Sequence, residues 1–189
     1  KISELLPTIK SRCQQLFFPP LKNEVMLNAL SEKELDQNQL KLIINLAGGS
    51  FSEAIRLCEQ DIDEIKNKTI EIMRTLARWD KKAIYNYLDD LRKLYKNDSK
   101  VFLQLIRSIN FWFRDAACLK AGADQAELIH NDQFTQIKNF VENYPDFRPD
   151  KVNKALENCI DLLERNVYIN LVLMETFFKI REYAFKRKK

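Results

Sequence analysis

Apolar residues recur every three or four positions along most of the chain, and polar residues fill the positions between them. This spacing is typical of helices that bury one face, so the pattern predicts an all-α protein. The expected helices span residues 22–30, 36–47, 50–58, 61–78, 80–95, 99–120, 150–166 and 167–185, with one or two short helices inside 125–142.

Helix start and stop signals support these bounds. Gly48-Gly49 ends the second helix, because glycine adopts the backbone conformation that closes a helix. Ser50 and Glu53 have the spacing of a capping box at the start of the third. Asp80 and Ser99 are the expected N-caps of two longer helices.

The helix expected at 167–185 is apolar on two faces. One stripe contains Ile169, Val172, Leu173, Thr176, Phe177 and Ile180. A second stripe contains Leu171, Met174, Phe178 and Phe185. Such a helix either lies at the centre of a bundle or contacts a partner chain, and both can hold for one helix.

Composition indicates a globular chain with long elements. The 189 residues are 46% hydrophobic and 31% charged, with 3 glycines and 5 prolines, which favours helices over sandwiches or barrels. The net charge of +4 equals the charge of the last four residues, Lys186, Arg187, Lys188 and Lys189. This basic end is either a solvated helix terminus or a contact for DNA.

The sequence lacks the residues for independent catalysis. Gly48-Gly49-Ser50 is not followed by the lysine of a phosphate-binding loop. His130 is the single histidine, in a polar segment where a surface or capping role is expected, and no Ser-His-Asp set is evident around it.

The four cysteines are too widely spaced for a zinc site, so we expect no metal. The last three lie in apolar helical patterns and are expected to be buried free thiols in a reducing cytoplasm. No apolar run is long enough to span a bilayer.

Ser11, Arg12 and Cys13 precede a short apolar run at 14–18 that is expected to be a strand, ended by Pro19-Pro20. The guanidinium of an arginine is a fork of donors that suits phosphate oxygens. From the residues alone, Arg12 is either a surface charge or an arginine that reaches a neighbouring subunit's nucleotide.

Four stretches resemble the AAA+ clamp-loader subunits of bacterial DNA polymerase III. "LLPTIKSRCQQLFF" resembles the Ser-Arg-Cys motif of that family, and "LAGGSFSEAIRL" resembles its lid-domain motif. "FWFRDAACLKAGADQAELIHND" and "NVYINLVLMETFFKI" are similar to its collar-domain signature and its terminal collar helix. The four stretches occur in the family's order and are spread along the chain between residues 5 and 180.

The resemblance implies three parts. Residues 1–18 would be the helix-plus-strand end of a nucleotide-binding domain, residues 19–60 a three-helix lid, and residues 61–189 a helical-bundle collar that oligomerises. Ser52 stands where the family's ATPase subunits usually carry a nucleotide-sensing arginine, with Arg56 one turn on. This departure favours a subunit that does not itself use ATP. The alternatives are an ATP-binding, gamma/tau-like subunit without its nucleotide domain, or a helical DNA-binding module.

The resemblance also implies a mechanism. Arg12 would be the trans-acting finger, with Ser11 and Cys13 positioning it, while ATP and Mg²⁺ are bound by neighbouring subunits. The partners would be the gamma/tau and delta subunits in the same complex, and through it the sliding clamp and primed DNA. The collar interface would include Leu171, Met174 and Phe178. Without the upstream domain, we expect residues 1–18 to be poorly supported.

Overall fold

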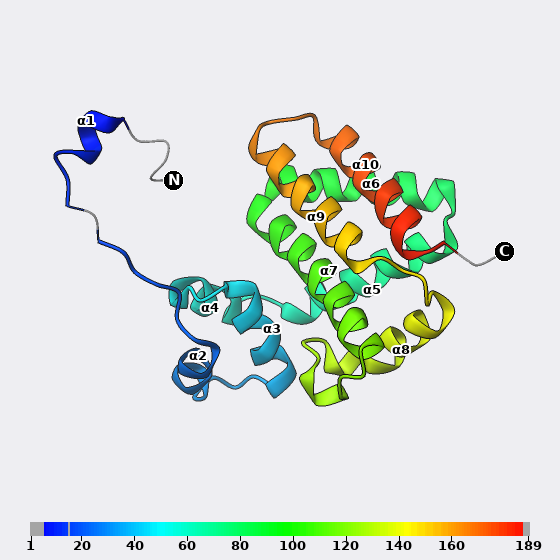
Figure 1. Cartoon of the computed structure of the whole chain (residues 1–189), viewed down its shortest axis with the longest axis horizontal. Helices are drawn as coiled ribbons and strands as arrows, with labels where there is room; N and C mark the ends of the chain where they lie inside the picture. Colours follow the sequence, from blue (N-terminus) through cyan, green and yellow to red (C-terminus); the bar gives the residue numbers. More distant parts are fainter. Residues whose placement is uncertain (1–5, 15, 187–189) are drawn as a thin grey trace.

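The computed structural model describes residues 6–14 and 16–186, and these residues form helices and no strand (Figure 1). The all-α prediction is therefore confirmed for this part of the chain. The elements are α1 (Pro7–Lys10), α2 (Asn23–Leu30), α3 (Gln37–Ala47), α4 (Phe51–Cys58), α5 (Ile62–Arg78), α6 (Lys81–Asn97), α7 (Ser99–Lys120), the 3-10 turns η2 (Gln125–Glu127) and η3 (Asn131–Gln133), α8 (Phe134–Asn143), α9 (Pro149–Glu164) and α10 (Ile169–Ala184).

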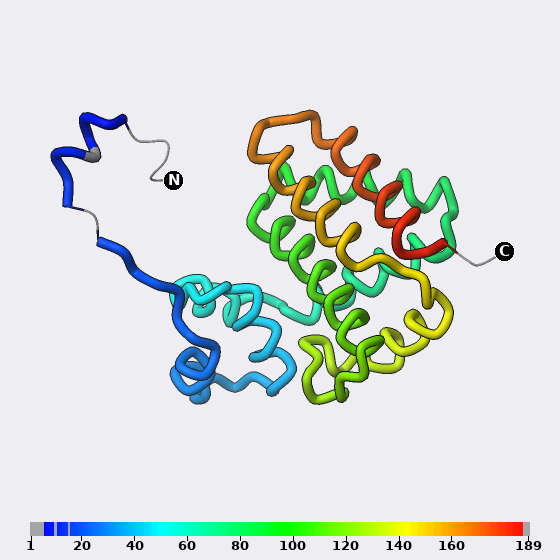
Figure 2. Tube along the Cα trace, in the orientation of Figure 1, coloured from blue at the N-terminus to red at the C-terminus, as the bar shows by residue number. Residues whose placement is uncertain are grey.

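The trace gathers into two groups of helices (Figure 2). Helices α2 to α4 pack on one another, and α5 to α10 form a larger bundle around α7, which contacts α5, α6, α8 and α9. Helix α3 packs against both α5 and α7, so the two groups touch. Their buried residues belong to one continuous hydrophobic core.

Side-chain caps set the start of α3. The Asp36 carboxylate accepts hydrogen bonds from the backbone N–H groups of Asn38 and Gln39, at 2.7 and 2.8 Å. The Gln39 side-chain oxygen accepts in return from the Asp36 N–H at 3.2 Å, which completes a capping box. At the other end, Gly48 has a φ of 56°, the left-handed conformation expected of a helix-ending glycine.

Two predicted caps differ from the structure. Ser50 caps α4 by accepting from the Glu53 N–H, but the Glu53 side chain binds Arg56 and Gln104 instead of returning to Ser50. The cap of α7 is Asp98 and not Ser99, because the carboxylate accepts from the second and third N–H groups of the helix. A carboxylate there also faces the positive end of the helix dipole.

Helix α10 buries the first of its two predicted stripes completely. Ile169, Val172, Leu173, Thr176, Phe177 and Ile180 are all buried. On the second stripe Leu171, Met174 and Phe178 are exposed, whereas Phe185 is only 2% exposed, so its assignment to that stripe was wrong. The helix ends at Ala184, and Phe185 leaves the helical register to pack among Phe113, Phe140 and Tyr144.

The N-terminal segment departs most from its prediction. The strand expected at 14–18 is not formed in residues 14 and 16–18, and residue 15 lies outside the described part of the chain. A strand needs a neighbouring strand to pair with, and the described residues offer none. In α2 the buried positions are Met26 and Leu30, while Val25 and Leu27 are exposed.

Candidate functional site

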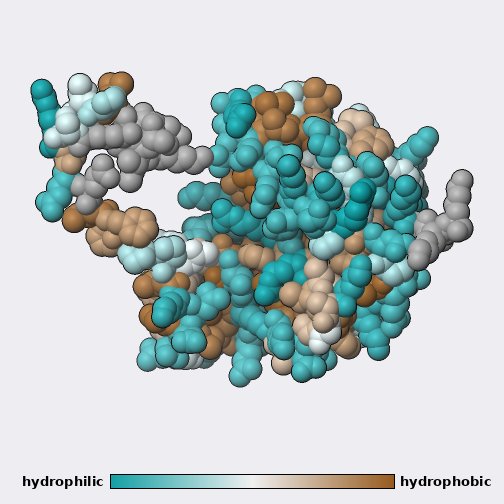
Figure 3. All heavy atoms as spheres, in the orientation of Figure 1, coloured by the Kyte–Doolittle hydropathy of each residue, from teal (hydrophilic) through white to brown (hydrophobic). Residues whose placement is uncertain are grey.

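The predicted Ser-Arg-Cys motif lies on an exposed arm. Ser11, Arg12 and Cys13 follow the four-residue helix α1, and all three are exposed. The Ser11 hydroxyl donates to the Thr8 carbonyl at 3.2 Å, which closes the end of α1. Leu16, Phe17 and Phe18 beyond them are 73 to 85% exposed, and apolar residues are visible along this arm in Figure 3. The described arm therefore presents Arg12 to solvent.

A second candidate is an apolar face of the bundle that we call the α6–α10 face. It contains Leu171, Met174 and Phe178 of α10 and Tyr85 of α6, which are 64%, 44%, 56% and 75% exposed. Helix α10 packs beside α6, and Tyr85, Met174 and Phe178 line one pocket between them. Helical spacing places Leu171 on the same side of α10 as Met174 and Phe178. Exposed apolar groups gathered in this way are typical of a protein–protein contact.

A pocket of about 210 Å³ opens in this face. Its lining is Trp79, Lys81, Ile84, Tyr85, Leu88, Met174, Phe177 and Phe178. Apart from Lys81 the lining is apolar and aromatic, which suits an apolar side chain of a partner rather than a charged substrate.

The turn between α5 and α6 forms one wall of this pocket. Trp79 ends α5 with a φ of 54°, an uncommon value for a residue with a side chain. Its ring meets Phe178 edge-on with centroids 5.3 Å apart, and the Arg181 guanidinium lies 5.5 Å from the ring centroid. Arg181 also donates to the Leu76 and Ala77 carbonyls at 3.0 and 3.1 Å, so it caps α5 and fixes the turn.

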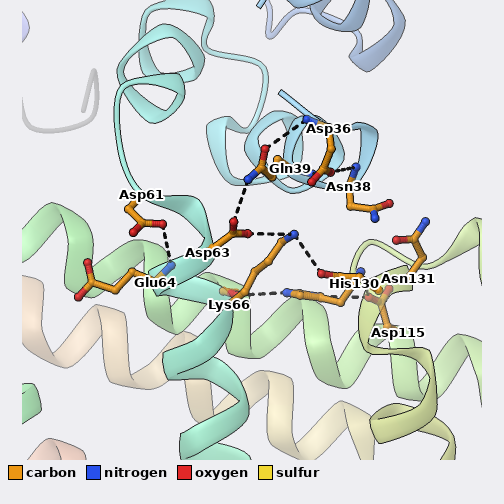
Figure 4. A network of polar contacts seen from close by, with 12 residues as sticks. Asp36, Asn38, Gln39, Asp61, Asp63, Glu64, Lys66, Asp115, His130 and Asn131 are labelled. Carbon is orange, nitrogen blue, oxygen red and sulfur yellow. Dashed lines mark hydrogen bonds and ion pairs between the residues drawn. The ribbon is translucent and has the colours of Figure 1, made fainter. Parts of the chain in front are cut away.

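Polar contacts join the α2–α4 group to the bundle. The Gln39 amide donates to Asp63 at 2.9 Å, and Lys66 pairs with Asp63 at 3.5 Å and with Asp132 at 3.0 Å (Figure 4). The Lys41 ammonium donates to the Ala126 carbonyl at 2.6 Å. The Gln39–Asp63 and Lys41–Ala126 contacts fix the orientation of α3 on the bundle, while Lys66 links α5 to η3.

Glu53 adds a further link between the groups. Its carboxylate accepts from Arg56 at 2.6 Å and from the Gln104 amide of α7 at 2.9 Å. The Arg56 hydrogen bond, helped by Gln104, lowers the pKa of the Glu53 carboxyl. Arg56, which lies one turn after Ser52, is therefore engaged in an ion pair on its own helix.

His130 is fully buried, so the predicted surface role was wrong. Its Nδ1 lies 3.1 Å from the Asp115 carboxylate and its Nε2 lies 3.2 Å from the Ser108 hydroxyl. Asp115 also accepts from the backbone N–H groups of Ile129 and His130, at 3.0 and 2.7 Å. These contacts tie the segment after η2 to α7 (Figure 4).

Asp115, His130 and Ser108 thus have the hydrogen-bond order of a serine hydrolase triad, a set that the sequence did not reveal. All three residues have at most trace exposure, and Ser108 contacts Thr69 at 2.9 Å on its other side. None of them lines a described pocket of the bundle. A nucleophile that no substrate can reach does no acyl transfer, so the set is structural.

The basic residues at the C-terminal end were a further candidate, as a contact for DNA. Lys186 is exposed, and Arg187, Lys188 and Lys189 lie outside the described residues.

The four cysteines are free, and of the three expected to be buried Cys159 is buried while Cys58 and Cys118 are half-buried. Burial raises the pKa of the Cys159 thiol to about 11. In residues 6–14 and 16–186 no helix has the length and apolar character needed to cross a bilayer.

Comparison with known proteins identifies the family to which the larger part of the chain is similar. A family model described as DNA polymerase III, delta subunit, C terminal, matches residues 63–180. The chain is 28% identical over 137 residues to DNA polymerase III subunit delta' of Bacillus subtilis (strain 168). That alignment covers 71% of this chain and 40% of the relative, so the chain spans less than half of the relative's length. No solved structure matches.

Proposed function

The chain belongs to the family formed by the C-terminal regions of DNA polymerase III delta subunits, and on that premise we propose that it is part of a non-catalytic member of a clamp-loader complex. In this proposal residues 61–189 are the collar that joins the complex and residues 19–60 are the lid. The longer protein would assemble with gamma/tau and delta subunits, and through them act on the sliding clamp and primed DNA.

One observation carries the proposal. The family match at 63–180 coincides with the α5–α10 bundle, and that bundle has an apolar face on α6 and α10. A collar helix that packs on a neighbouring protein of the complex needs such a face, because apolar burial is the main favourable term in association. Tyr85 and Phe178 are the anchors we expect, since aromatic residues beside a pocket carry a large share of interface energy.

Assembly with partner subunits from the same genome tests this role. Native mass spectrometry of the full-length protein with those subunits should give a defined hetero-oligomer. Leu171→Glu, which puts an unpaired charge into the contact, should weaken assembly by about 30-fold or more, because burying such a group costs at least about 2 kcal/mol. Leu27→Glu on α2 is the matched control, since Leu27 is also an exposed helical leucine. Equal assembly of both variants would contradict the proposed collar contact.

Arg12 is proposed as the trans-acting finger of the longer protein, with Ser11 and Cys13 holding it in place. A guanidinium beside the γ-phosphate bound by a neighbour stabilises the charge of the transition state, and ATP and Mg²⁺ would belong to that neighbour. The exposure of Arg12 is compatible with this role.

The finger role has its own test. Arg12→Ala in the full-length protein should leave assembly intact and lower the DNA-dependent ATPase rate of the reconstituted complex. Arg12→Lys keeps the charge but loses the donor fork, so it should restore only part of the rate. An unchanged rate with Arg12→Ala would remove the finger and leave the collar role standing.

A further inference from the structure

The buried contacts around His130 require one more proton than an Asp115 carboxylate and a neutral imidazole supply. Four hydrogen-bonding contacts lie in a row from α5 to the 128–132 segment. They join the Ile65 carbonyl to Thr69, Thr69 to Ser108, Ser108 to His130, and His130 to Asp115. We call this row the Asp115 relay. Each contact between two oxygen or nitrogen atoms needs one hydrogen between them.

The relay can be followed proton by proton. The Thr69 hydroxyl donates its single proton to the Ile65 carbonyl at 2.8 Å. Thr69 can then only accept from Ser108, at 2.9 Å, which uses the single proton of that hydroxyl. Ser108 is left to accept from His130, so the ring nitrogen Nε2 must carry a proton.

The other ring nitrogen must also carry a proton. Asp115 is surrounded by donors: two backbone N–H groups, and the Arg114 guanidinium at 3.3 Å. A carboxylate among donors is an acceptor, so His130 Nδ1 donates to it across 3.1 Å. A neutral imidazole has one ring proton, whereas an imidazolium has two and satisfies all four contacts of the relay.

The charges around the ring support the same assignment. On α7 the ring faces Asp115, which pairs with Arg114. Beside it, Lys66 of α5 pairs with Asp63 of the same helix and with Asp132 of the 128–132 segment. These are two cations and three anions, so a cationic His130 balances the cluster. A buried charge is tolerated where it is paired and hydrogen-bonded, as both partners are here.

We propose that His130 is an imidazolium in the folded chain, a buried cation paired with Asp115, and that the second proton on its ring holds the 128–132 segment against α5 and α7. The segment holds Asp132 against Lys66, and the nearby Ala126 carbonyl receives Lys41 of α3. The proton therefore stabilises the part of the bundle on which the α2–α4 group rests. Removing it leaves one relay contact without a hydrogen and the cluster with an excess negative charge.

Proton counting by NMR tests this directly, because His130 is the single histidine of the sequence. In ¹⁵N-labelled protein near neutral pH, both ring nitrogens should show a directly bonded proton. A ring with one protonated nitrogen and one acceptor nitrogen would overturn the proposal, without the need for any variant.

Two substitutions at Thr69 test the relay itself. Thr69→Val keeps the shape but frees the Ser108 proton for Nε2, so the ring should fall from two protons to one. Thr69→Ser keeps the hydroxyl and should retain both. Circular dichroism establishes that each variant is folded. Two ring protons in folded Thr69→Val would overturn the relay as the source of the second proton.

Discussion

Asp115→Ala should strongly destabilise the bundle. Asp115 is fully buried and accepts from two backbone N–H groups and the His130 ring. Alanine leaves these three donors without a partner inside the core. Each buried donor without a partner costs about 1–3 kcal/mol, and breaking a buried charged pair costs about 3–5 kcal/mol in total. We therefore expect a loss of about 3–5 kcal/mol in the free energy of unfolding.

Urea unfolding followed by circular dichroism measures this loss. With an m-value of about 2 kcal/mol per molar urea, the midpoint should fall by roughly 2 M. Asp115→Asn keeps one carbonyl oxygen and most of the shape, so its loss should be smaller. Asp89→Ala is the control, because Asp89 is also a helical aspartate but forms its ion pairs on the exposed side of α6, where they contribute little. A loss for Asp115→Ala within about 1 kcal/mol of the control would show that the buried contacts of Asp115 do not stabilise the bundle.

Three further outcomes are expected. Arg181→Ala should cost about 1–3 kcal/mol in urea unfolding, because the last carbonyls of α5 lose two charged donors; a loss below about 0.5 kcal/mol would contradict the cap. A thiol reagent at pH 8 should label exposed Cys13 rapidly and Cys159 only on unfolding, since burial raises the pKa of the Cys159 thiol to about 11. The same pKa difference should make the folded state lose stability as the pH rises from about 9 toward 11. The hydrogen bond from Arg56 lowers the pKa of Glu53 below 4.5, so the ionised carboxylate stabilises the fold above about pH 4.5 and this stabilisation is lost as the pH falls. Glu53→Gln should therefore show a smaller acid-induced drop in urea midpoint than the unsubstituted chain. An equal drop would contradict the role of the Glu53 carboxylate.

Local patterns were sufficient to predict most helices. Apolar spacing located α3 to α7 within a few residues, and Asp61 and Asp80 cap the helices that follow them. The two apolar faces of α10 were also readable, because helical periodicity places Leu171, Met174 and Phe178 on one side. Whether these three side chains are exposed depends on which helices pack beside α10, and helical periodicity does not reveal that.

The errors came from contacts between distant residues. His130 was expected at the surface because its sequence neighbours are polar, yet its partners lie 15 and 22 residues away. One signal was available: Asp115 lies among the buried positions Trp112, Phe113 and Ala116 of α7, and an acid on such a face needs a partner. The strand expected at 14–18 failed because strand pairing is not a local property.

Residue-level footprinting of the assembled complex measures whether the α6–α10 face is covered on assembly. In hydroxyl-radical labelling, Tyr85 and Met174 should react in the free full-length protein, since they are 75% and 44% exposed on the α6–α10 face. Both residues should lose most of their reactivity when the partner subunits are added and a complex forms. Unchanged reactivity of Tyr85 and Met174 in a complex that contains this protein would show that the α6–α10 face is not the collar contact.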